Sequence, residues 1–454
     1  MIVLKFGGTS VTDADAIGRA ATITRSRLEQ QPIVVVSALA GVTTALLALA
    51  EHAADGQLVL ALRGVEAIRD RHLHEADALL TEASDGDETR AELSAMCDEL
   101  ASLGEALSVL GHATPRSLDA IAAYGELLST TLVHAAFHAR GLPCDLVDAR
   151  EVMITDDAHT RAMPRAEDLT REARSCLLPL LAAGRVPVLG GFIGRTPQGV
   201  TTTIGRGGGD YTAALIGAAL DAEGIEIWTD VDGMLTADPR LVSAARLIEE
   251  IRFDEAAELA AFGAKVLHPS TIAPAVQRGI PVFIYNARHP GATGTRITAD
   301  APRRAVCAIA GKGDVAVVKV RSSRMLLAHG FLRRFFEVFE HRRVSVDVVA
   351  TSEVSVSVTV DEARDLDALV VDLRALGDVT IERHRAVIAI VGAGLGGRSE
   401  IMARALGALR GIRLHMLSVS ATGINLTMIV DADRLQAAMR ALHGEFFERG
   451  GVTS

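Results

Sequence analysis

Lys5 lies beside a glycine-rich turn near the start of the sequence, where it could help to bind a phosphate group. It falls within an apolar run, residues 2–6, which Gly7 and Gly8 follow before a predicted helix from about Asp13. A strand, a glycine turn and a helix start together present backbone N–H groups to an anion. A lysine within an apolar strand needs a buried partner or a bound anion, which disfavours the alternative of a solvated lysine beside a tight turn. We therefore expect phosphate as the ligand.

A second glycine-rich segment, Gly207 to Gly209, precedes another predicted helix. Because glycine has no Cβ, a ligand can approach the backbone closely there. Asp210 falls in the first turn of this helix, where helix capping alone would account for it. Arg206 is harder to explain by capping, since its planar guanidinium suits a substrate carboxylate or a phosphate. Together these residues indicate a binding site.

Polar residues also follow the predicted strand at residues 225–228, starting with Thr229 and Asp230. The carboxyl end of a parallel strand is where α/β sheets bind ligands, so contact with a nucleotide is expected. Farther along, Lys265 could reach a polyphosphate. Taken alone it would be a surface lysine, and only the combination with the other segments gives it weight.

The elements that must position these residues alternate between strand and helix over residues 1–298, which predicts an α/β domain. Short apolar runs at residues 33–37 and elsewhere lack polar alternation, as expected of central strands covered by helices on both faces. A mostly parallel sheet follows, with strands at residues 2–6, 33–37, 186–190, 225–229 and 282–285. Residues 57–111 carry only a helical signal, which predicts an all-helical excursion that projects from the domain.

A loop at residues 288–294, followed by Pro302, marks the predicted end of this domain. From residue 303 the pattern strand, helix, strand, strand, helix occurs twice, which predicts two small α+β units at residues 303–385 and 386–454. Residues 303–311 are a candidate first strand for the second unit. The expected elements are residues 315–320, 329–341, 346–350, 354–360 and 361–376, then 387–391, 399–409, 413–419, 425–430 and a helix from 432.

Composition excludes several classes of protein. With 49% apolar and 23% charged residues, the 454-residue chain has the balance of a globular protein with more than one domain. Its net charge of −11, without a dense basic run, argues against a nucleic-acid partner. The four cysteines form no CxxC pair, which argues against zinc sites and disulfides. No membrane-spanning run or cleavable leader is evident, so the cytoplasm is the expected location.

Four motifs, KFGGTS, GRGGGDYTAAL, TDVDGMLTADPR and FGAKVLHP, occur in an order that resembles the aspartate kinases of the amino-acid kinase superfamily. The resemblance spans nearly the whole chain. It implies an amino-acid kinase fold, with helices on both faces of a mostly parallel sheet, followed by two ferredoxin-like ACT domains. It also implies transfer of the γ-phosphoryl group of MgATP to the β-carboxylate of L-aspartate, giving 4-phospho-L-aspartate, the first step of lysine, threonine and methionine biosynthesis.

The resemblance implies roles for individual residues. Glu126 would pair with the substrate ammonium, Arg206 would bind its α-carboxylate, and Asp210 would orient the lysines. The implied catalytic set is Lys5, Gly7, Gly8, Asp210 and Lys265. The implied substrate contacts are Ser37, Thr43, Glu126, Arg206, Gly207 and Gly208. The implied ATP contacts are Lys5, Gly8, Thr229, Asp230, Leu235, Arg240, Lys265 and Val266. No protein metal site is implied, because Mg²⁺ arrives with ATP.

The C-terminal units most resemble those of the lysine-sensitive aspartate kinases, which implies feedback inhibition by lysine and a homodimer joined through the ACT domains. The implied effector pocket consists of Met325, Gly330, Phe331, Leu332, Val346, Asp347, Ser352 and Glu353. Asp347 or Glu353 would pair with the effector ammonium; the alternative is two solvated carboxylates. Gly209, Leu235 and Ala328 depart from the usual pattern of the family, and we expect the first two to alter affinity rather than abolish activity.

Two other functions stay open: an acyl-phosphate kinase acting on glutamate or acetylglutamate, and a non-enzymatic amino-acid sensor. Paired ACT repeats argue against the first, and Lys5, Asp210 and Lys265 argue against the second. The GxGxxG spelled by residues 392–397 is interpreted as an ACT loop rather than a dinucleotide site, since no acidic residue follows at the required distance. The pair His72 and His74 is interpreted as a solvated helix face. The length also leaves no room for a fused homoserine dehydrogenase.

Overall fold

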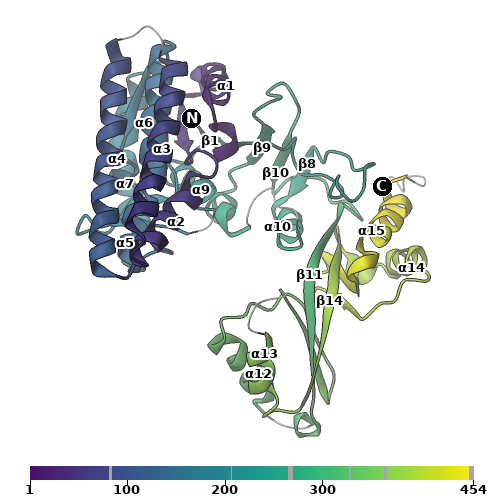
Figure 1. Ribbon diagram of the computed structural model, residues 1–454. Helices are drawn as coiled ribbons and strands as arrows, with labels where there is room; N and C mark the ends of the chain where they lie inside the picture. Colours follow the sequence, from purple (N-terminus) through teal and green to yellow (C-terminus); the bar gives the residue numbers. More distant parts are fainter. Residues whose placement is uncertain (81–83, 206, 264–268, 327–328, 362–365, 449–454) are drawn as a thin grey trace. The chain divides into compact units, whose positions relative to one another are not determined.

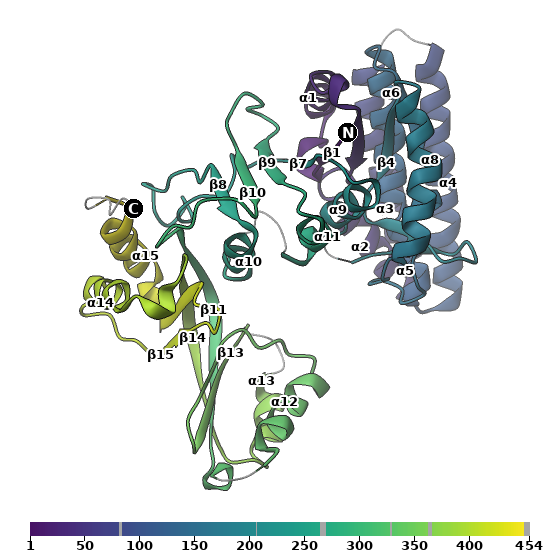
Figure 2. The ribbon, with the colours of Figure 1, turned by 180° about the vertical axis from the view of Figure 1, so that it is seen from behind.

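The computed structural model describes residues 1–80, 84–205, 207–263, 269–326, 329–361 and 366–448 (Figures 1 and 2). The chain folds into two compact units. The first comprises Met1–Gly233 and Leu267–Ala299, and the second comprises Met234–Val266 and Asp300–Ser454. Among the described residues, no helix is both long enough and apolar enough to cross a membrane.

A twisted, mostly parallel sheet forms the centre of the first unit, as predicted. Within this unit its strands lie in the order β3-β4-β2-β1-β7-β9-β10, and only the β9–β10 pairing is antiparallel. Every residue of β1, β2 and β4 is buried, which explains their uninterrupted apolar sequences. The strands are β1 (Ile2–Phe6), β2 (Pro32–Val36), β3 (Cys144–Val147), β4 (Val186–Gly190), β7 (Gly224–Thr229), β9 (Val282–Asn286) and β10 (Thr295–Thr298), with a separate hairpin of β5 (Ile193–Arg195) and β6 (Thr201–Thr203).

Helices cover both faces of this sheet. Leu4 and Phe6 pack into a core cluster with residues of α1, α2 and α6, whereas alternation along β1 directs Lys5 to the opposite face, where α9 packs. Site residues from β1 and α9 therefore meet on one side. The helices are α1 (Ala14–Arg25), α2 (Val42–Ala54), α3 (Leu58–Leu79), α4 (Ser84–Leu110), α5 (Pro115–Ala122), α6 (Tyr124–Ala139), α7 (Ala149–Val152), α8 (Ala166–Ala182), α9 (Gly208–Leu220) and α11 (Ala273–Arg278).

The predicted helical excursion consists of α3 and α4, but these helices do not project from the domain. They run beside α6 (Figure 1). Their apolar residues, among them Val65, Ile68 and Leu93, belong to the main core cluster of the unit. His72 is also fully buried, with Nδ1 2.7 Å from the Ile68 carbonyl oxygen, so the prediction of a solvated histidine face was wrong for this residue.

The second unit contains an antiparallel sheet in the order β12-β13-β11-β14-β16-β15. The two central strands, β11 (Ala308–Arg321) and β14 (Asp378–Val391), run through both predicted repeats. Residues 315–321 of β11 pair with residues 378–385, and residues 308–312 pair with residues 387–391. The other elements are β12 (Val349–Thr351), β13 (Ser355–Asp361), β15 (Met416–Val419), β16 (Asn425–Asp431), α12 (Phe331–His341), α13 (Leu366–Leu373), α14 (Ser399–Ala408) and α15 (Leu435–His443).

The first unit ends at Ala299, next to the predicted boundary at residue 298, but the predicted domain also included a segment that belongs to the second unit. Residues 234–266, which carry β8 (Glu250–Arg252) and α10 (Phe253–Ala261), belong to the second unit. Ala237 and Val242 share a core cluster with residues of β14, β16 and α15. Thr236 Oγ1 also lies 3.0 Å from Nε2 of the buried His443. The GxGxxG segment forms the connection between β14 and α14, as predicted.

Candidate active site

A cavity of about 390 Å³ in the first unit collects most of the predicted substrate and catalytic residues. It lies where the first turn of α9, the first turn of α6 and the loop after β2 approach the carboxyl end of β1. Parallel α/β sheets bind ligands at this edge. The lining residues are Lys5, Gly8, Ser37, Ala38, Leu39, Ala40, Gly41, Thr43, Thr44, Glu126, Phe192, Gly205, Gly207, Gly208, Gly209 and Asp210.

Lys5 and Asp210 form an ion pair at the wall of this cavity, with Nζ 2.7 Å from Oδ1. Both side chains are largely buried, so the pair fixes the ammonium in position rather than leaving it mobile in solvent. Two glycines leave space around it. A Cβ added at Gly7 would lie 3.4 Å from Lys5 Nζ, and one added at Gly209 would lie 3.1 Å from Lys5 Cε.

The Gly7 amide does not have its predicted role in this structure. Its N–H donates to the Trp228 carbonyl oxygen at 3.1 Å, because β1 and β7 are paired neighbours. Ser10 Oγ donates to the same carbonyl at 3.0 Å. Gly7 does not line the cavity, whereas Gly8 does, and a Cβ at Gly8 would lie 2.8 Å from the Ala38 carbonyl oxygen. Close packing against the loop after β2 thus requires glycine at position 8.

Glu126 presents a buried carboxylate to the cavity. It lies in the first turn of α6 and is only 4% exposed. Oε1 accepts a hydrogen bond from the Ala38 N–H at 3.3 Å, while Oε2 has no partner among the described residues. Burial raises the pKa of Glu126 to about 8, although the Ala38 hydrogen bond and the charge of Lys5 act in the opposite direction. A ligand ammonium would satisfy the free oxygen and favour the ionised form.

The loop after β2 carries Ser37 and leads into α2, where Thr43 lies in the first turn. The Ser37 N–H donates to the Phe6 carbonyl oxygen at 3.1 Å. Sequence reasoning missed Arg71 of α3, whose Nη1 donates to the Ala40 carbonyl oxygen at 2.7 Å. Arg71 follows Ile68, which is buried, by three residues. That helical spacing was the available signal that it faces the domain rather than solvent.

The second glycine segment forms the opposite wall. Gly205 and Gly207 have φ angles of +80° and +77°, a conformation that side chains with a Cβ rarely adopt. A Cβ at Gly208 would lie 2.7 Å from the Phe192 ring. At Gly209 it would lie 2.9 Å from Ser37 Oγ, so this departure from the family pattern enlarges the space beside Lys5. Arg206 lies outside the described residues, between two glycines that line the cavity.

The residues predicted to contact ATP do not all lie in one part of the structure. Thr229 and Asp230 lie at the carboxyl end of β7. Thr229 ends β7, and its hydroxyl donates to Asp230 Oδ1 at 3.2 Å. Sequence reasoning missed a neighbouring pair, in which Asn286 Nδ2 donates to Asp232 Oδ1 at 2.6 Å. Asn286 is the register partner of Thr229 and ends β9 in the same way, which was the signal for it.

The other predicted ATP contacts belong to the second unit or lie outside the described residues. Leu235 and Arg240 belong to the second unit, where Arg240 pairs with Asp238 at 2.6 Å. Lys265 and Val266 lie outside the part of the chain that the structure describes. The arrangement of these four residues around a nucleotide therefore stays a prediction.

Comparison with known proteins decides the family. Residues 1–286 match the model of the amino acid kinase family, and residues 388–446 match an ACT domain. The chain is 37% identical over 457 residues to lysine-sensitive aspartokinase 3 of Escherichia coli, covering 99% of both chains. The chain belongs to the aspartokinases. It is also 36% identical to the chloroplastic aspartokinase 3 of Arabidopsis thaliana, with 98% of this chain and 81% of that protein covered.

Solved structures of aspartokinases show the same fold. The structure of E. coli aspartokinase III in complex with aspartate and ADP, called the R-state, matches with a TM-score of 0.86 and covers 99% of this chain and all of the other. The complex of the same enzyme with lysine and aspartate, called the T-state, matches with a TM-score of 0.84 and the same coverage. The predicted fold class, an amino-acid kinase domain followed by ACT domains, is confirmed.

The predicted effector residues of this aspartokinase surround the start of α12 and the β12–β13 hairpin. Gly330 has a φ of +77° at the start of α12, and the side chain of Phe331 is buried in the core beside Phe335. Ser352 Oγ lies 2.7 Å from Ser355 Oγ. Leu332 and Glu353 are exposed, and Met325 and Val346 are partly buried. Ala328 lies outside the described residues.

Asp347, one of the two candidate partners for an effector ammonium, already has a cationic neighbour. Lys312 Nζ lies 3.3 Å from Asp347 Oδ2 and also pairs with Asp361. Burial raises the pKa of Asp347, although the Lys312 ammonium opposes the change. An effector ammonium that binds Asp347 must therefore compete with Lys312 or share the carboxylate with it.

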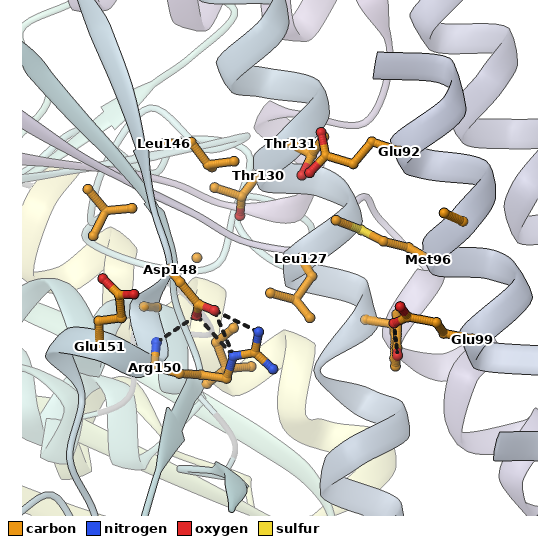
Figure 3. A pocket seen from close by; sticks show the side chains of 16 residues that line it. Glu92, Met96, Glu99, Leu127, Thr130, Thr131, Leu146, Asp148, Arg150 and Glu151 are labelled. Carbon is orange, nitrogen blue, oxygen red and sulfur yellow. Dashed lines mark hydrogen bonds and ion pairs between the residues drawn. The ribbon is translucent and has the colours of Figure 1, made fainter. Parts of the chain in front are cut away.

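A second and larger cavity, of about 550 Å³, lies between α4, α6 and the carboxyl ends of β3 and β4 (Figure 3). Arg150 pairs with Asp148 at 2.6 Å, and the Tyr124 hydroxyl donates to Glu99 at 2.9 Å. None of the predicted site residues lines it. It lacks the glycine segments and the buried lysine of the first cavity.

Proposed function

We propose that this aspartokinase transfers the γ-phosphoryl group of MgATP to the β-carboxylate of L-aspartate in the 390 Å³ cavity. The observation that carries the proposal is the convergence of Lys5, Asp210 and Glu126 on that cavity. The buried Glu126 carboxylate, with one oxygen unpartnered, suits the ammonium of an amino acid. The fixed Lys5 ammonium suits the negative charge of a transferring phosphoryl group.

A β-carboxylate oxygen of aspartate attacks the γ-phosphorus, the bond from that phosphorus to the bridging oxygen breaks, and ADP leaves. The nucleophile is already ionised at neutral pH, so no general base is required. Catalysis then rests on alignment and on stabilisation of charge on the phosphoryl oxygens. Lys5 supplies the charge, Asp210 holds it in place, and Glu126 and Arg206 orient the substrate. Mg²⁺, which enters with ATP, neutralises phosphate charge.

A kinetic assay tests the substrate assignment. We expect ADP release that depends on L-aspartate, with kcat/KM for L-glutamate lower by at least about tenfold, because one extra methylene in a shaped pocket typically costs that much. A higher kcat/KM for glutamate would show that glutamate, and not aspartate, is the substrate. No turnover with either amino acid would favour the sensor hypothesis.

We propose lysine as the effector and the region of Asp347 as its site. The Lys312–Asp347 contact supports this, since that carboxylate already accepts an ammonium from this chain. In the same assay, lysine should suppress turnover, whereas threonine and methionine should not. If lysine does not change turnover, the assignment of kinase activity would stand and the assignment of lysine as effector would be contradicted.

We propose a homodimer joined through the second unit. Its edge strands β12 and β15 expose apolar side chains, with Val349 39%, Leu417 44% and Val419 36% exposed. Exposed apolar edge strands are sites of strand pairing with another chain. Light scattering should give the mass of a dimer or a multiple of it, with and without lysine. The mass of a single chain under both conditions would contradict the proposal.

A further inference from the structure

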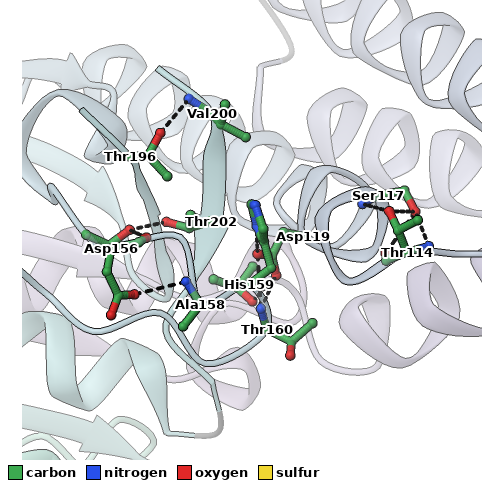
Figure 4. A network of polar contacts seen from close by, with 12 residues as sticks. Thr114, Ser117, Asp119, Asp156, Ala158, His159, Thr160, Thr196, Val200 and Thr202 are labelled. Carbon is green, nitrogen blue, oxygen red and sulfur yellow. Dashed lines mark hydrogen bonds and ion pairs between the residues drawn. The ribbon is translucent and has the colours of Figure 1, made fainter. Parts of the chain in front are cut away.

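Asp119 is a buried carboxylate that the sequence analysis did not single out (Figure 4). It lies on α5 and is 1% exposed. Three donors surround it. Thr203 Oγ1 lies 2.5 Å from Oδ1, His159 Nδ1 lies 2.7 Å from Oδ2, and the Thr160 N–H donates at 3.0 Å. Since a carboxylate only accepts hydrogen bonds, it matches a set of three donors.

Gly205 and Gly207 to Gly209 form one wall of the proposed substrate cavity, which we call the glycine wall. The three donors belong to the two segments that support this wall. Thr203 ends β6 and directly precedes the segment with Gly205 and Gly207. The Thr203 carbonyl oxygen accepts from the Ala162 N–H at 2.9 Å. The Thr160 carbonyl oxygen lies 3.4 Å from the position that a Cβ of Gly205 would take. The glycine wall therefore rests on the loop that Asp119 holds.

The backbone of the same loop is strained at Thr160, the residue whose N–H contacts Asp119. Thr160 has a φ of +68°, which is unfavourable for a residue with a Cβ. Such a conformation persists where surrounding contacts impose it, and the hydrogen bond from the Thr160 N–H to Asp119 is one of these contacts. Loss of the carboxylate should therefore let the loop relax away from Gly205.

Asp119 is also connected to the other wall of the cavity. Helix α5 ends at Ala122, and α6 begins at Tyr124 with Glu126 in its first turn. The Leu127 N–H donates to the Ala123 carbonyl oxygen at 3.1 Å, which continues the helical path between α5 and α6. Asp119 thus joins the helix pair that carries Glu126 to the segment that carries Gly205 and Gly207.

We propose that Asp119, through Thr203 and His159, is a positioning residue that sets the distance between Glu126 and the glycine wall and thereby the affinity for aspartate. Asp119 is not among the residues that line the cavity. The proposal rests on the proposed function, in which these two walls hold the ammonium and the α-carboxylate of the substrate. Substitution of Asp119 should therefore change the affinity for aspartate rather than the affinity for ATP or the rate of phosphoryl transfer.

The test compares Asp119→Asn with two variants of its partner. Asp119→Asn places an NH₂ donor against other donors, and we expect KM for aspartate to rise about 10- to 100-fold, with KM for ATP within about twofold. Thr203→Val removes the hydroxyl at similar volume and should act in the same direction. Thr203→Ser keeps the hydroxyl and should stay close to the parent protein.

Asp156→Asn is the matched control. Asp156 Oδ1 accepts from the N–H groups of Ala158 at 3.1 Å and Met163 at 2.9 Å, so it supports the ends of the loop and bonds neither the N–H of Thr160, the residue that lies against Gly205, nor the Thr203 hydroxyl. We expect its kinetics to match the parent protein. If Asp119→Asn does not fold, as judged by thermal unfolding, the Thr203 pair decides the question.

An unchanged KM for aspartate in folded Asp119→Asn and Thr203→Val would overturn the proposal. An equal change of KM for aspartate in Asp156→Asn would also overturn it. An equal rise in KM for aspartate and for ATP would do so as well. Glu126→Gln separates this failure from that of the proposed function. If it leaves KM for aspartate unchanged while the parent protein turns over aspartate, the substrate site itself is misassigned.

Discussion

Lys5→Met should lower the turnover number of this aspartokinase by a factor on the order of 10³, because removing one preorganised charge from the transferring phosphoryl group has effects of that size. The Lys5 ammonium is buried and held at 2.7 Å from Asp210, so no mobile surface lysine can take its place. KM for aspartate should change much less, since in the proposed mechanism the substrate ammonium binds at Glu126 rather than at Lys5. A coupled assay of ADP release at saturating substrates checks both expectations.

The same variant should also lose stability, and this effect must be separated from catalysis. Breaking a buried ion pair by removing one partner typically costs about 3–5 kcal/mol, since the other charge stays buried and uncompensated. The double variant Lys5→Met/Asp210→Asn removes both charges and should recover much of the free energy of unfolding without recovering turnover. If turnover returned together with stability, the role of Lys5 would be structural. Turnover that persists in Lys5→Met alone would contradict the proposed mechanism.

The central sheet and the cavity that it supports follow closely from local sequence signals. The runs that form β1, β2 and β4 are apolar throughout because both faces of these strands are covered. Residues at the carboxyl ends of such strands, and at the starts of the helices that follow, meet at one edge of the sheet. For this reason the residues predicted from separate motifs, Lys5, Gly8, Gly207, Gly208 and Asp210, line one cavity. Ser37, Thr43 and Glu126, which the family resemblance implied, line the same cavity.

Features that depend on long-range packing could not be predicted in this way. Nothing near residue 234 marks a change of unit, because Ala237 and Val242 find their core only with strands far along the chain. The Gly7 amide was misassigned since its acceptor, the Trp228 carbonyl, lies on a strand distant in sequence. Asp119 was not singled out from the sequence. Its three donors come from segments about 40 and 80 residues away, and this is a tertiary property.

The affinity for aspartate should depend on pH through Glu126. Burial raises the pKa of this carboxyl to about 8 in the ligand-free protein. In the proposed site it is the ionised form that pairs with the substrate ammonium. Below about pH 8, binding must first remove a proton from Glu126. The dissociation constant for aspartate should therefore fall about tenfold for each unit of rising pH and level off above about 8.

Calorimetric titration of aspartate without ATP, in two buffers of different ionisation enthalpy, measures the proton released on binding directly. We expect release approaching one proton per aspartate at neutral pH. Glu126→Gln is the control, since it keeps the shape of the site but cannot titrate, so any pH dependence that comes from the substrate itself remains in this variant. A dissociation constant with the same pH dependence in both proteins would show that Glu126 does not bind the ammonium.

The same pKa fixes the sign of a stability effect in the ligand-free protein. Between about pH 4.5 and 8 the folded state holds a proton on Glu126 that the unfolded state has released, so this group makes the free energy of unfolding fall as pH rises through that window. Glu126→Gln removes the effect and should raise the melting temperature at pH 8 more than at pH 5. Added aspartate should likewise raise the melting temperature of the parent protein more at pH 8 than at pH 5, because its ammonium compensates the buried charge of Glu126. A variant that is less stable than the parent at pH 8 would mean that the folded protein already compensates the ionised carboxylate, and the substrate ammonium would then not be needed for that purpose.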